Sequence, residues 1–329
     1  MKYFKSMFKN IAVIFAKVAI FLLPQKIVAK LKNKYIYQPR IKQLKVGSNR
    51  TPLFGRIYFE VRTRCNGNCD FCAASMENEK RADTTMPFSS YKKVIDELSE
   101  IDYSGRVAYH VNNDPLIFSE LEQYCDYARK SLPKAWIEIR TNGKALTKEK
   151  VESLISAGIN ELKVNDYSSR QSQKVANAVE SILNEVIPVY CDYNKDSNAY
   201  VLKDSKRELI VSYNDRDTHE VLSSRGGTSP NKKSKPEFSS EFCEHPFYQF
   251  NITTDGRVSK CCADLYFSEP MGNINQEKVL DIWYGEKFKA VRSKLFEGDR
   301  KMRLCEECDY YGVRCVNTRL GQIIYSATK

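Results

Sequence analysis

The chain has 329 residues, of which 42% are hydrophobic and 12% aromatic, so it can bury a large core and is not a disordered protein. Its net charge is +11, but residues 1–50 hold twelve Lys and Arg and no Asp or Glu, so the remaining residues sum to 11 − 12 = −1. The net positive charge is therefore confined to a basic arm, the first 50 residues, and the rest of the chain is near-neutral. This distribution is not that of a typical nucleic-acid-binding protein, so we do not expect nucleic acid as a partner.

The basic arm contains one apolar stretch, residues 11–23, which is interrupted by Lys17. A spanning helix needs about 20 apolar residues, so this stretch is too short. The lysines of residues 2–17 share one sector of a helical wheel, which predicts a helix lying in a membrane surface. Pro24 ends that helix, and residues 25–34 could form a second basic one. We therefore expect a cytoplasmic protein whose residues 1–34 bind the inner face of the membrane.

Three alternatives for the arm stay open. The helix could pack on the protein's own body, or the arm could contact nucleic acid. A signal peptide is the third alternative, although no small-residue cleavage site follows Leu23.

Beyond the arm, short apolar runs alternate with amphipathic runs of helical period, which predicts a parallel sheet with right-handed crossovers. Such a sheet would curl into a partial barrel, and its ligands would gather at the carboxyl ends of the strands. The six expected strands are residues 56–62, 106–111, 136–140, 161–164, 186–190 and 208–212, and the expected helices are residues 89–101, 119–132, 147–157 and 168–184.

The chain has eleven cysteines, and they are clustered. An odd count with short C-x-x-C spacings in a chain of this length favours metal binding over disulfides. The first cluster, C-N-G-N-C-D-F-C, places Cys65, Cys69 and Cys72 directly after the first expected strand. Thiolates suit zinc or iron with sulfide, and a closed structural site uses four ligands. Three cysteines around four irons would leave one iron open to bind something else.

This C-x3-C-x2-C spacing, with Phe71 before the last cysteine, resembles the signature of the radical S-adenosylmethionine superfamily. Later strand ends resemble the superfamily too. Asn112-Asn113-Asp114-Pro115 stands where the family often has Gly-Gly-Glu-Pro, so Asn replaces both glycines and Asp replaces Glu. The resemblance implies a partial (β/α)6 TIM-like barrel and a [4Fe–4S] cluster on the three cysteines. It further implies S-adenosylmethionine contacts from Phe71, Asn112, Asn113, Asp114, Thr141 in Arg140-Thr141-Asn142-Gly143, and Asn165 in Lys163-Val164-Asn165-Asp166.

The second group of cysteines lies in the C-terminal third. Residues 247–260 alternate in polarity around Asp255-Gly256, which predicts a hairpin. An amphipathic helix is expected over residues 279–296, followed by Cys305-Glu306-Glu307-Cys308. A hairpin with a C-x2-C pair is also how a zinc ribbon is built, so on chemistry alone zinc and iron–sulfur both stay open.

This arrangement resembles the SPASM and twitch domains that follow radical S-adenosylmethionine barrels. The resemblance implies an auxiliary [4Fe–4S] cluster in a small α+β domain, with Cys262 or Cys315 as alternative ligands and too few cysteines for a third cluster. The expected divisions are a basic arm at 1–50, a core barrel at 51–222, a linker at 223–242 and the auxiliary-cluster domain at 243–329. The implied auxiliary ligands are Cys243, Cys261, Cys305 and Cys308.

The resemblance also implies an activity. One electron from the reduced cluster would cleave S-adenosylmethionine to a 5′-deoxyadenosyl radical, which abstracts hydrogen from the substrate. An auxiliary cluster that accepts the remaining electron favours dehydrogenation of a small molecule, sugar or lipid-linked compound. The expected electron donor is a reductase such as flavodoxin or ferredoxin. The alternatives are a maturase of a ribosomally made peptide or protein and, more remotely, a zinc-binding non-enzyme.

Several further residues are candidates for the site. Asp192, Tyr193 and His110 lie on or after expected strands and are candidate bases, although a structural side chain explains each equally well. Cys191 could face the barrel centre, whereas Cys125 falls on the apolar face of its helix and is expected in the core.

Overall fold

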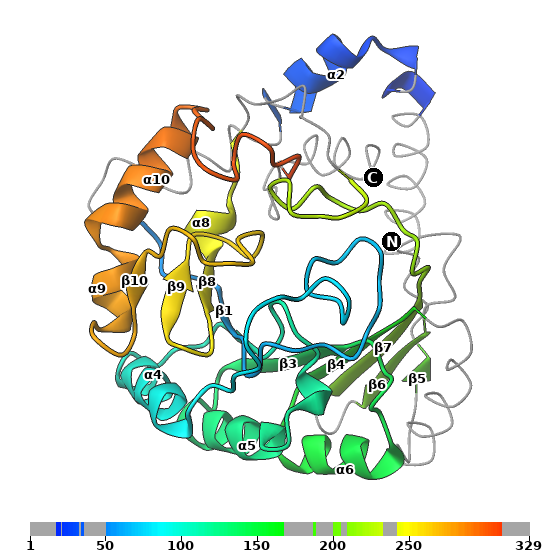
Figure 1. The fold of residues 1–329 in the computed structure, drawn as a ribbon, viewed down its shortest axis with the longest axis vertical. Coiled ribbons are helices and arrows are strands. Elements are labelled where there is room, and N and C mark those ends of the chain that lie inside the picture. Colours follow the sequence, from blue (N-terminus) through cyan, green and yellow to red (C-terminus); the bar gives the residue numbers. More distant parts are fainter. Residues whose placement is uncertain are drawn as a thin grey trace, which may run out of the picture.

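A computed structural model describes residues 18–20, 22–32, 34–35, 51–167, 187–188, 200–204, 209–232 and 242–310. Within these residues one curved sheet of ten strands forms the centre of the molecule, in the order β10-β9-β8-β1-β2-β3-β4-β7-β6-β5 (Figure 1). Six neighbouring strands run parallel: β8 (Gln249–Ile252), β1 (Arg56–Phe59), β2 (Arg106–Ala108), β3 (Trp136–Thr141), β4 (Glu161–Asp166) and β7 (Leu209–Asp215).

Antiparallel strands extend both edges of this parallel run. β9 (Arg257–Ser259) and β10 (Gly272–Asn273) lie at one edge, and β6 (Tyr200–Asp204) and β5 (Ile187–Pro188) lie at the other. The helices are α2 (Gln25–Lys32), α4 (Phe88–Glu100), α5 (Leu121–Ser131), α6 (Lys148–Ser156), α8 (His245–Tyr248), α9 (Val279–Trp283) and α10 (Glu286–Phe296), with a 3-10 turn, η2 (Pro115–Ile117). In Figure 1, α4, α5 and α6 follow one another along the outside of the sheet.

The two faces of the sheet differ in polarity because side chains alternate along each strand. The face under the helices is apolar and fully buried, and it includes Ile57, Phe59, Val107, Ile137, Ile139, Leu162 and Phe250. The opposite, inner face of the curved sheet carries polar side chains from the same strands, among them Arg56, Tyr58, Glu138, Arg140, Lys163 and Asn251. A parallel sheet normally reads as apolar on both faces, so this polar inner face marks a binding site.

The expected α/β fold with a mostly parallel sheet is confirmed, but the fifth expected strand does not belong to the parallel run. Residues 187–188 pair antiparallel with β6 at the edge, and β7 is the neighbour of β4. β6 itself was not predicted. Only four residues separate β6 from β7, and so short a connection joins antiparallel strands rather than parallel ones. The helix expected over 168–184 lies outside the described residues.

The predicted hairpin is confirmed as β8 and β9, which turn at Gly256 with φ 86°. β8 also pairs in parallel with β1, so the cysteine-bearing hairpin continues the sheet of the barrel. The helix expected over 279–296 is divided into α9 and α10. Gly285 takes an extended conformation there as the N-cap of α10.

Among the described residues, no helix combines the length and apolar content needed to cross a membrane. Residues 1–17 of the predicted surface helix lie outside the described part of the chain.

Candidate active site

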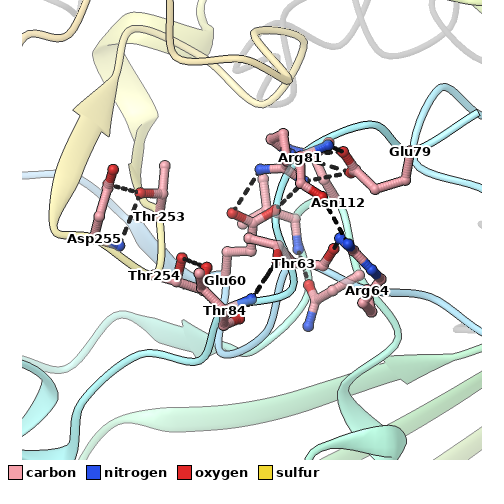
Figure 2. A network of polar contacts seen from close by, with 12 residues as sticks. Glu60, Thr63, Arg64, Glu79, Arg81, Thr84, Asn112, Thr253, Thr254 and Asp255 are labelled. Atoms are coloured by element: carbon pink, nitrogen blue, oxygen red, sulfur yellow. Dashed lines mark hydrogen bonds and ion pairs between the residues drawn. The ribbon is translucent and has the colours of Figure 1, made fainter.

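The first cysteine group lies on a long loop between β1 and α4 whose two ends are fastened together. Thr63 N donates to Thr84 O at 3.0 Å. Arg81 donates to both carboxylate oxygens of Glu60 at 2.8 and 2.9 Å, and it contacts Glu79 on its other side (Figure 2). The side chains of Glu60 and Glu79 are 0% and 2% exposed, so water does not screen these ion pairs. They fix the base of the loop on the end of β1.

All three cysteines of this loop are free thiols, Cys69 buried and the other two half-buried. A Cβ atom added at Gly67 would lie 3.3 Å from Cys65 Sγ and 3.9 Å from Cys69 Sγ, so both sulfurs face the same small space. Gly67 N donates to Cys65 Sγ at 3.3 Å, and Asn142 Nδ2 lies 3.6 Å from that sulfur. The loop therefore gathers thiols beside the end of β3.

Burial raises the pKa of Cys65 to about 12 and that of Cys69 to about 11, and the neighbouring thiols add to the shift. Free thiols with such pKa values stay protonated at neutral pH, whereas coordination to a metal deprotonates a thiol outright. Sheltered thiols on one loop, with N–H groups aimed at a sulfur, are the donor set that an iron–sulfur cluster requires.

Phe71 connects this loop to two other segments. Its ring centroid lies 5.4 Å from that of Tyr167, directly after β4. Its carbonyl oxygen accepts a hydrogen bond from Ser229 Oγ at 3.0 Å. Phe71 is only 9% exposed, so its ring is buried where the cysteine loop meets the end of β4.

Asp114, where the superfamily often has Glu, is 2% exposed, and its carboxylate is already bound. It accepts from Thr141 Oγ1 at 2.9 and 3.0 Å, from Asn142 N at 2.7 Å and from Leu116 N at 3.0 Å. Aspartate is one methylene shorter than glutamate, so its oxygens stay within this turn. The carboxylate and Thr141 thus hold the ends of β2 and β3 together.

The asparagine side chains of the predicted cofactor site differ in how many of their amide atoms already have hydrogen-bond partners. Asn113 caps its own strand, since Oδ1 accepts from Val111 N and Nδ2 donates to Tyr109 O. Asn112 Oδ1 accepts from Arg225 at 2.6 Å, but the buried Asn112 Nδ2 has no partner among the described residues.

Asn165 lies at the end of β4, and its Oδ1 accepts from Asn214 Nδ2 at 3.2 Å. The amide nitrogens of Asn112 and Asn165 remain as donors for a ligand.

The second cysteine group is brought together by the loop after α10 and the hairpin. A Cβ atom at Gly226, which has φ 65°, would lie 2.9 Å from Leu304 Cβ, so the two loops touch. Ser224 Oγ donates to Glu307 O, and Ser224 N donates to Asp309 Oδ1. Residues 223–232, from the expected linker, are therefore packed against the Cys305–Cys308 turn.

Burial raises the pKa values of Cys243 and Cys261, that of Cys243 to about 12, and further thiols of the group add to both shifts. Cys262 lies beside Cys261, and Cys315 lies outside the described residues. In the part of the chain that the structure describes, no three His, Cys, Asp or Glu side chains converge tightly enough to hold a single metal ion. A four-iron cluster is larger than one ion, so its ligands stand further apart.

Ion pairs compensate the charges of the carboxylates on the polar inner face of the sheet. Glu138 is fully buried and accepts from Arg56 at 3.0 Å and from Arg106 at 2.6 Å. Glu161 accepts from Arg106 at 2.7 Å and from Trp136 Nε1 at 3.0 Å. These contacts pair two carboxylates on β3 and β4 with the guanidinium groups of β1 and β2.

A cavity of about 310 Å³ joins this polar face to the second cysteine group. Tyr58, His110 and Arg140 line it from the barrel, and Arg225 lines it from the segment before the hairpin. Its remaining wall includes Cys243, Cys261, Cys262, Cys305 and Cys308.

Sequence reasoning missed Glu138, Asn142 and Arg225 as parts of this site. A signal for Glu138 was present, because W-I-E-I-R-T places Glu138 and Arg140 on alternate positions of a strand that a parallel sheet would bury. The predicted core position of Cys125 is confirmed at 0% exposure. Cys191, Asp192 and Tyr193 lie outside the described residues.

Comparison with known proteins finds two family matches along the chain. Residues 59–165 match the model of the radical SAM superfamily, and residues 243–309 match SPASM, an iron–sulfur cluster-binding domain. An S-adenosyl-L-methionine-dependent 2-deoxy-scyllo-inosamine dehydrogenase from Niallia circulans is 29% identical over 266 residues, which cover 80% of this chain and 95% of that protein.

Two crystal structures are similar over most of their length. The structure of BtrN in complex with AdoMet and 2-DOIA is 27% identical with a TM-score of 0.65, and the match covers 80% of this chain and 96% of that one. BtrN in an open conformation is 25% identical with a TM-score of 0.56, over 79% of this chain and 94% of that one.

Proposed function

Because the chain belongs to the radical S-adenosylmethionine superfamily and carries a SPASM-type domain, we propose that it oxidises a secondary alcohol of a small polyol or aminocyclitol to a ketone. Its cofactors are S-adenosylmethionine, a [4Fe–4S] cluster and an auxiliary cluster. The observation that carries the proposal is the cavity lined on one side by polar barrel residues and on the other by the second cysteine group.

We assign the first cluster to Cys65, Cys69 and Cys72, and the auxiliary cluster to Cys243, Cys261, Cys305 and Cys308. When bound, these groups supply a 5′-deoxyadenosyl radical at one end of the site and an acceptor for one electron at the other. A substrate between them can lose a hydrogen atom on one side and an electron on the other, which is a two-electron oxidation.

The chain's own residues would bind the cofactor and exclude water. Asn112 Nδ2 is a buried donor with no partner among the described residues, so it can bind a polar group of S-adenosylmethionine. Asn165 is proposed to contact the ribose hydroxyls from the end of β4. Phe71 shelters the reacting centre, because its ring is buried against Tyr167 where the cysteine loop meets the end of β4.

The substrate class is supported by unsatisfied polar atoms on the inner face. Gln249 Oε1 and both polar atoms of Asn251 are buried and lack partners within the described ranges, although the residues are only 1% and 0% exposed. Buried amides of this kind are normally satisfied, so they favour a ligand rich in hydroxyl groups. The similarity to a 2-deoxy-scyllo-inosamine dehydrogenase supports the same class.

The test is an anaerobic assay of the reconstituted protein with dithionite, S-adenosylmethionine and 2-deoxy-scyllo-inosamine. We expect a ketone product, trapped as a hydrazone, together with 5′-deoxyadenosine. Cys69→Ala should abolish both products. The proposal is wrong if the protein consumes S-adenosylmethionine in the presence of short peptides but oxidises no polyol.

Two partners complete the proposal. A reductase such as flavodoxin or ferredoxin would supply the electron in the cell, and the basic arm would hold the enzyme at a membrane surface, where a lipid-linked substrate could also reach it. The arm's exposed apolar side chains support this location, since Val18 is 58% and Leu22 75% exposed next to lysine-rich α2.

A further inference from the structure

His110 lies just beyond the end of β2 and has two unsatisfied ring nitrogens. It is half-buried by its overall exposure, but both Nδ1 and Nε2 are inaccessible to water and have no hydrogen-bond partner in the described structure. The ring stands edge-on to Tyr58, with centroids 5.3 Å apart and planes at 88°. A histidine packed only as a core residue would normally find a partner for at least one nitrogen.

One carboxylate faces this imidazole. Glu138 Oε1 lies 3.8 Å from His110 Nε2 and 3.9 Å from an Arg140 guanidinium nitrogen, and it has no hydrogen-bond partner in the described ranges. The other oxygen, Oε2, accepts from Arg56 and Arg106. Two guanidinium groups therefore bind one oxygen of Glu138, while its other oxygen lies between the histidine and Arg140. A carboxylate that orients an imidazole is the arrangement by which many enzymes prepare a base.

The charges around His110 favour its neutral form. Burial, followed by the neighbouring charges of Arg140 on β3, Arg56 on β1 and Lys163 on β4, lowers the pKa of His110 well below its usual value. A neutral imidazole with Nε2–H toward Glu138 carries its lone pair on Nδ1, which can accept a proton.

The position of His110 matches the requirement of the reaction. It lines the barrel side of the cavity, whose other side is formed by the cysteines that would hold the auxiliary cluster. A substrate on the barrel side can therefore touch the histidine while lying next to that cluster. Oxidation of an alcohol releases a proton as well as an electron, and a water-poor cavity needs a fixed group to take that proton.

We propose that His110 is the catalytic base of the alcohol oxidation and that Glu138 is its positioning residue, an inference that rests on the proposed function. His110 Nδ1 would take the hydroxyl proton as the C–O single bond becomes C=O. When bound, S-adenosylmethionine and the auxiliary cluster would supply the acceptors for the carbinol hydrogen atom and for the remaining electron, so the step balances. His110 then releases its proton to solvent.

The test follows 2-deoxy-scyllo-inosamine that is deuterated at its carbinol carbons, with wild-type and His110→Gln holoenzyme. Wild type should give one ketone per deuterated 5′-deoxyadenosine. In His110→Gln, deuterium transfer should persist while ketone formation falls about a hundredfold, the usual contribution of a general base. Added imidazole should restore ketone formation in His110→Ala. Iron content and Tm check that each variant is folded.

Any other outcome would reject either the role of His110 or the proposed function. Wild-type ketone yield in His110→Gln overturns the base assignment, and equal losses of deuterium transfer and ketone reduce His110 to substrate positioning. A wild type that forms no ketone overturns the proposed function and this inference with it.

Glu138→Gln tests the positioning residue, with Glu161→Gln as the matched control because Arg106 also binds that carboxylate. Glu138→Gln should lower kcat about tenfold with little change in KM and alter the pH profile of kcat, since it changes the group that faces the base. Glu161→Gln should leave the pH profile unchanged. Identical profiles for both variants would mean that Glu138 acts only in the packing of the sheet.

Discussion

Asn142 connects the first cysteine loop to the end of β3. Its Nδ2 donates to Asn66 Oδ1 at 2.8 Å and lies 3.6 Å from Cys65 Sγ, and its backbone N donates to Asp114. Hydrogen bonds to cluster sulfurs raise the reduction potential of an iron–sulfur cluster. If Cys65 ligates the first cluster, Asn142 helps to set the potential at which that cluster accepts an electron.

We predict that Asn142→Ala makes the first cluster harder to reduce. A hydrogen bond worth about 1 kcal/mol corresponds to a shift of ~40 mV for a one-electron couple. A potentiometric titration followed by electron paramagnetic resonance measures the shift. Asn231→Ala, which removes a hydrogen bond to Glu220 O, is the control and should leave the potential unchanged. A potential that moves equally in both variants would rule out a direct effect on the sulfur.

Glu161 gives a pH-dependent contribution to stability. Burial alone would raise its pKa, but hydrogen bonds from Arg106 and Trp136 and the charge of Arg106 hold the pKa below the usual 4.5. A carboxyl group whose pKa is lower in the folded state stabilises the protein above its ordinary pKa, and this contribution disappears as pH falls through the folded value.

Glu161→Gln should therefore lower the free energy of unfolding by about 1–3 kcal/mol at pH 7, because the Arg106 and Trp136 donors lose a charged acceptor. The difference from wild type should shrink below about pH 4, where the wild-type carboxyl also becomes neutral. Thermal unfolding across this pH range measures it. Glu152→Gln, at an exposed residue 3.9 Å from Lys148, is the control and should change little. A gap that stays constant with pH would contradict this account.

Residues in the site differed in how far sequence could predict them. The spacing of Cys65, Cys69 and Cys72 lies within one loop, so the sequence alone brings them together. The contact between His110 and Glu138 depends on how β2 and β3 are paired, with Ala108 opposite Glu138. Sequence spacing does not contain that register, so His110 could be named only as one candidate among three.

At the level of elements, the segment before the hairpin determines where the second cysteine group lies. Gly226 and Gly227 have φ values of 65° and 82° and pack against Leu304 and Glu307. Sequence predicted a linker over residues 223–242, with the part after residue 228 expected to be exposed. The glycines instead allow a close approach of two backbones, which becomes visible only once both loops are placed.

Gly226→Ala should displace the Cys305–Cys308 turn, since the new Cβ would lie 2.9 Å from Leu304 Cβ at a φ that strains L-residues. We expect a loss of roughly 1–3 kcal/mol in stability and loss of iron from the auxiliary cluster alone. Gly298→Ala, at φ 78° after α10, controls for backbone strain. Equal iron loss in both variants would show that strain, rather than the contact with Leu304, is responsible.

In the sheet, the positions of strands could be predicted from local sequence, but the pairing of distant strands could not. The periodicity of residues 136–140 and 161–164 predicted β3 and β4 because each strand is a local apolar pattern. The pairing of β8 with β1 joins segments about 190 residues apart, and β7 pairs with β4 although a strand was expected between them in sequence. The short loop between β6 and β7 makes these strands antiparallel. Because β6 was not predicted, this loop could not be recognised from the sequence.

At the level of the whole molecule, the protein should bind two clusters independently of each other. Reconstituted wild type should hold about eight iron atoms, and Cys69→Ala and Cys261→Ala should each hold about half. Cys125→Ala, at a buried core thiol, should keep the full content and serves as the control. Iron analysis with absorption spectroscopy measures these values. Full iron in Cys261→Ala would move the auxiliary ligand to another cysteine, with Cys262 as the neighbour to test.

The basic arm predicts binding to anionic membranes. Full-length protein should pellet with vesicles containing phosphatidylserine, and a variant lacking residues 1–34 should bind at least about tenfold less, because each basic residue near the surface contributes about 1 kcal/mol. High salt should weaken binding of the full-length protein. Equal pelleting of both forms would contradict membrane binding by the arm and favour the alternative that it packs on the protein's own body.

The proposed function requires that a secondary alcohol is oxidised by loss of one hydrogen atom from carbon. A single turnover of wild-type enzyme with 2-deoxy-scyllo-inosamine deuterated at its carbinol carbons tests this directly by mass spectrometry. The account predicts one deuterium in 5′-deoxyadenosine and one ketone for each S-adenosylmethionine consumed. Unlabelled 5′-deoxyadenosine, or labelled 5′-deoxyadenosine without a ketone, would contradict it.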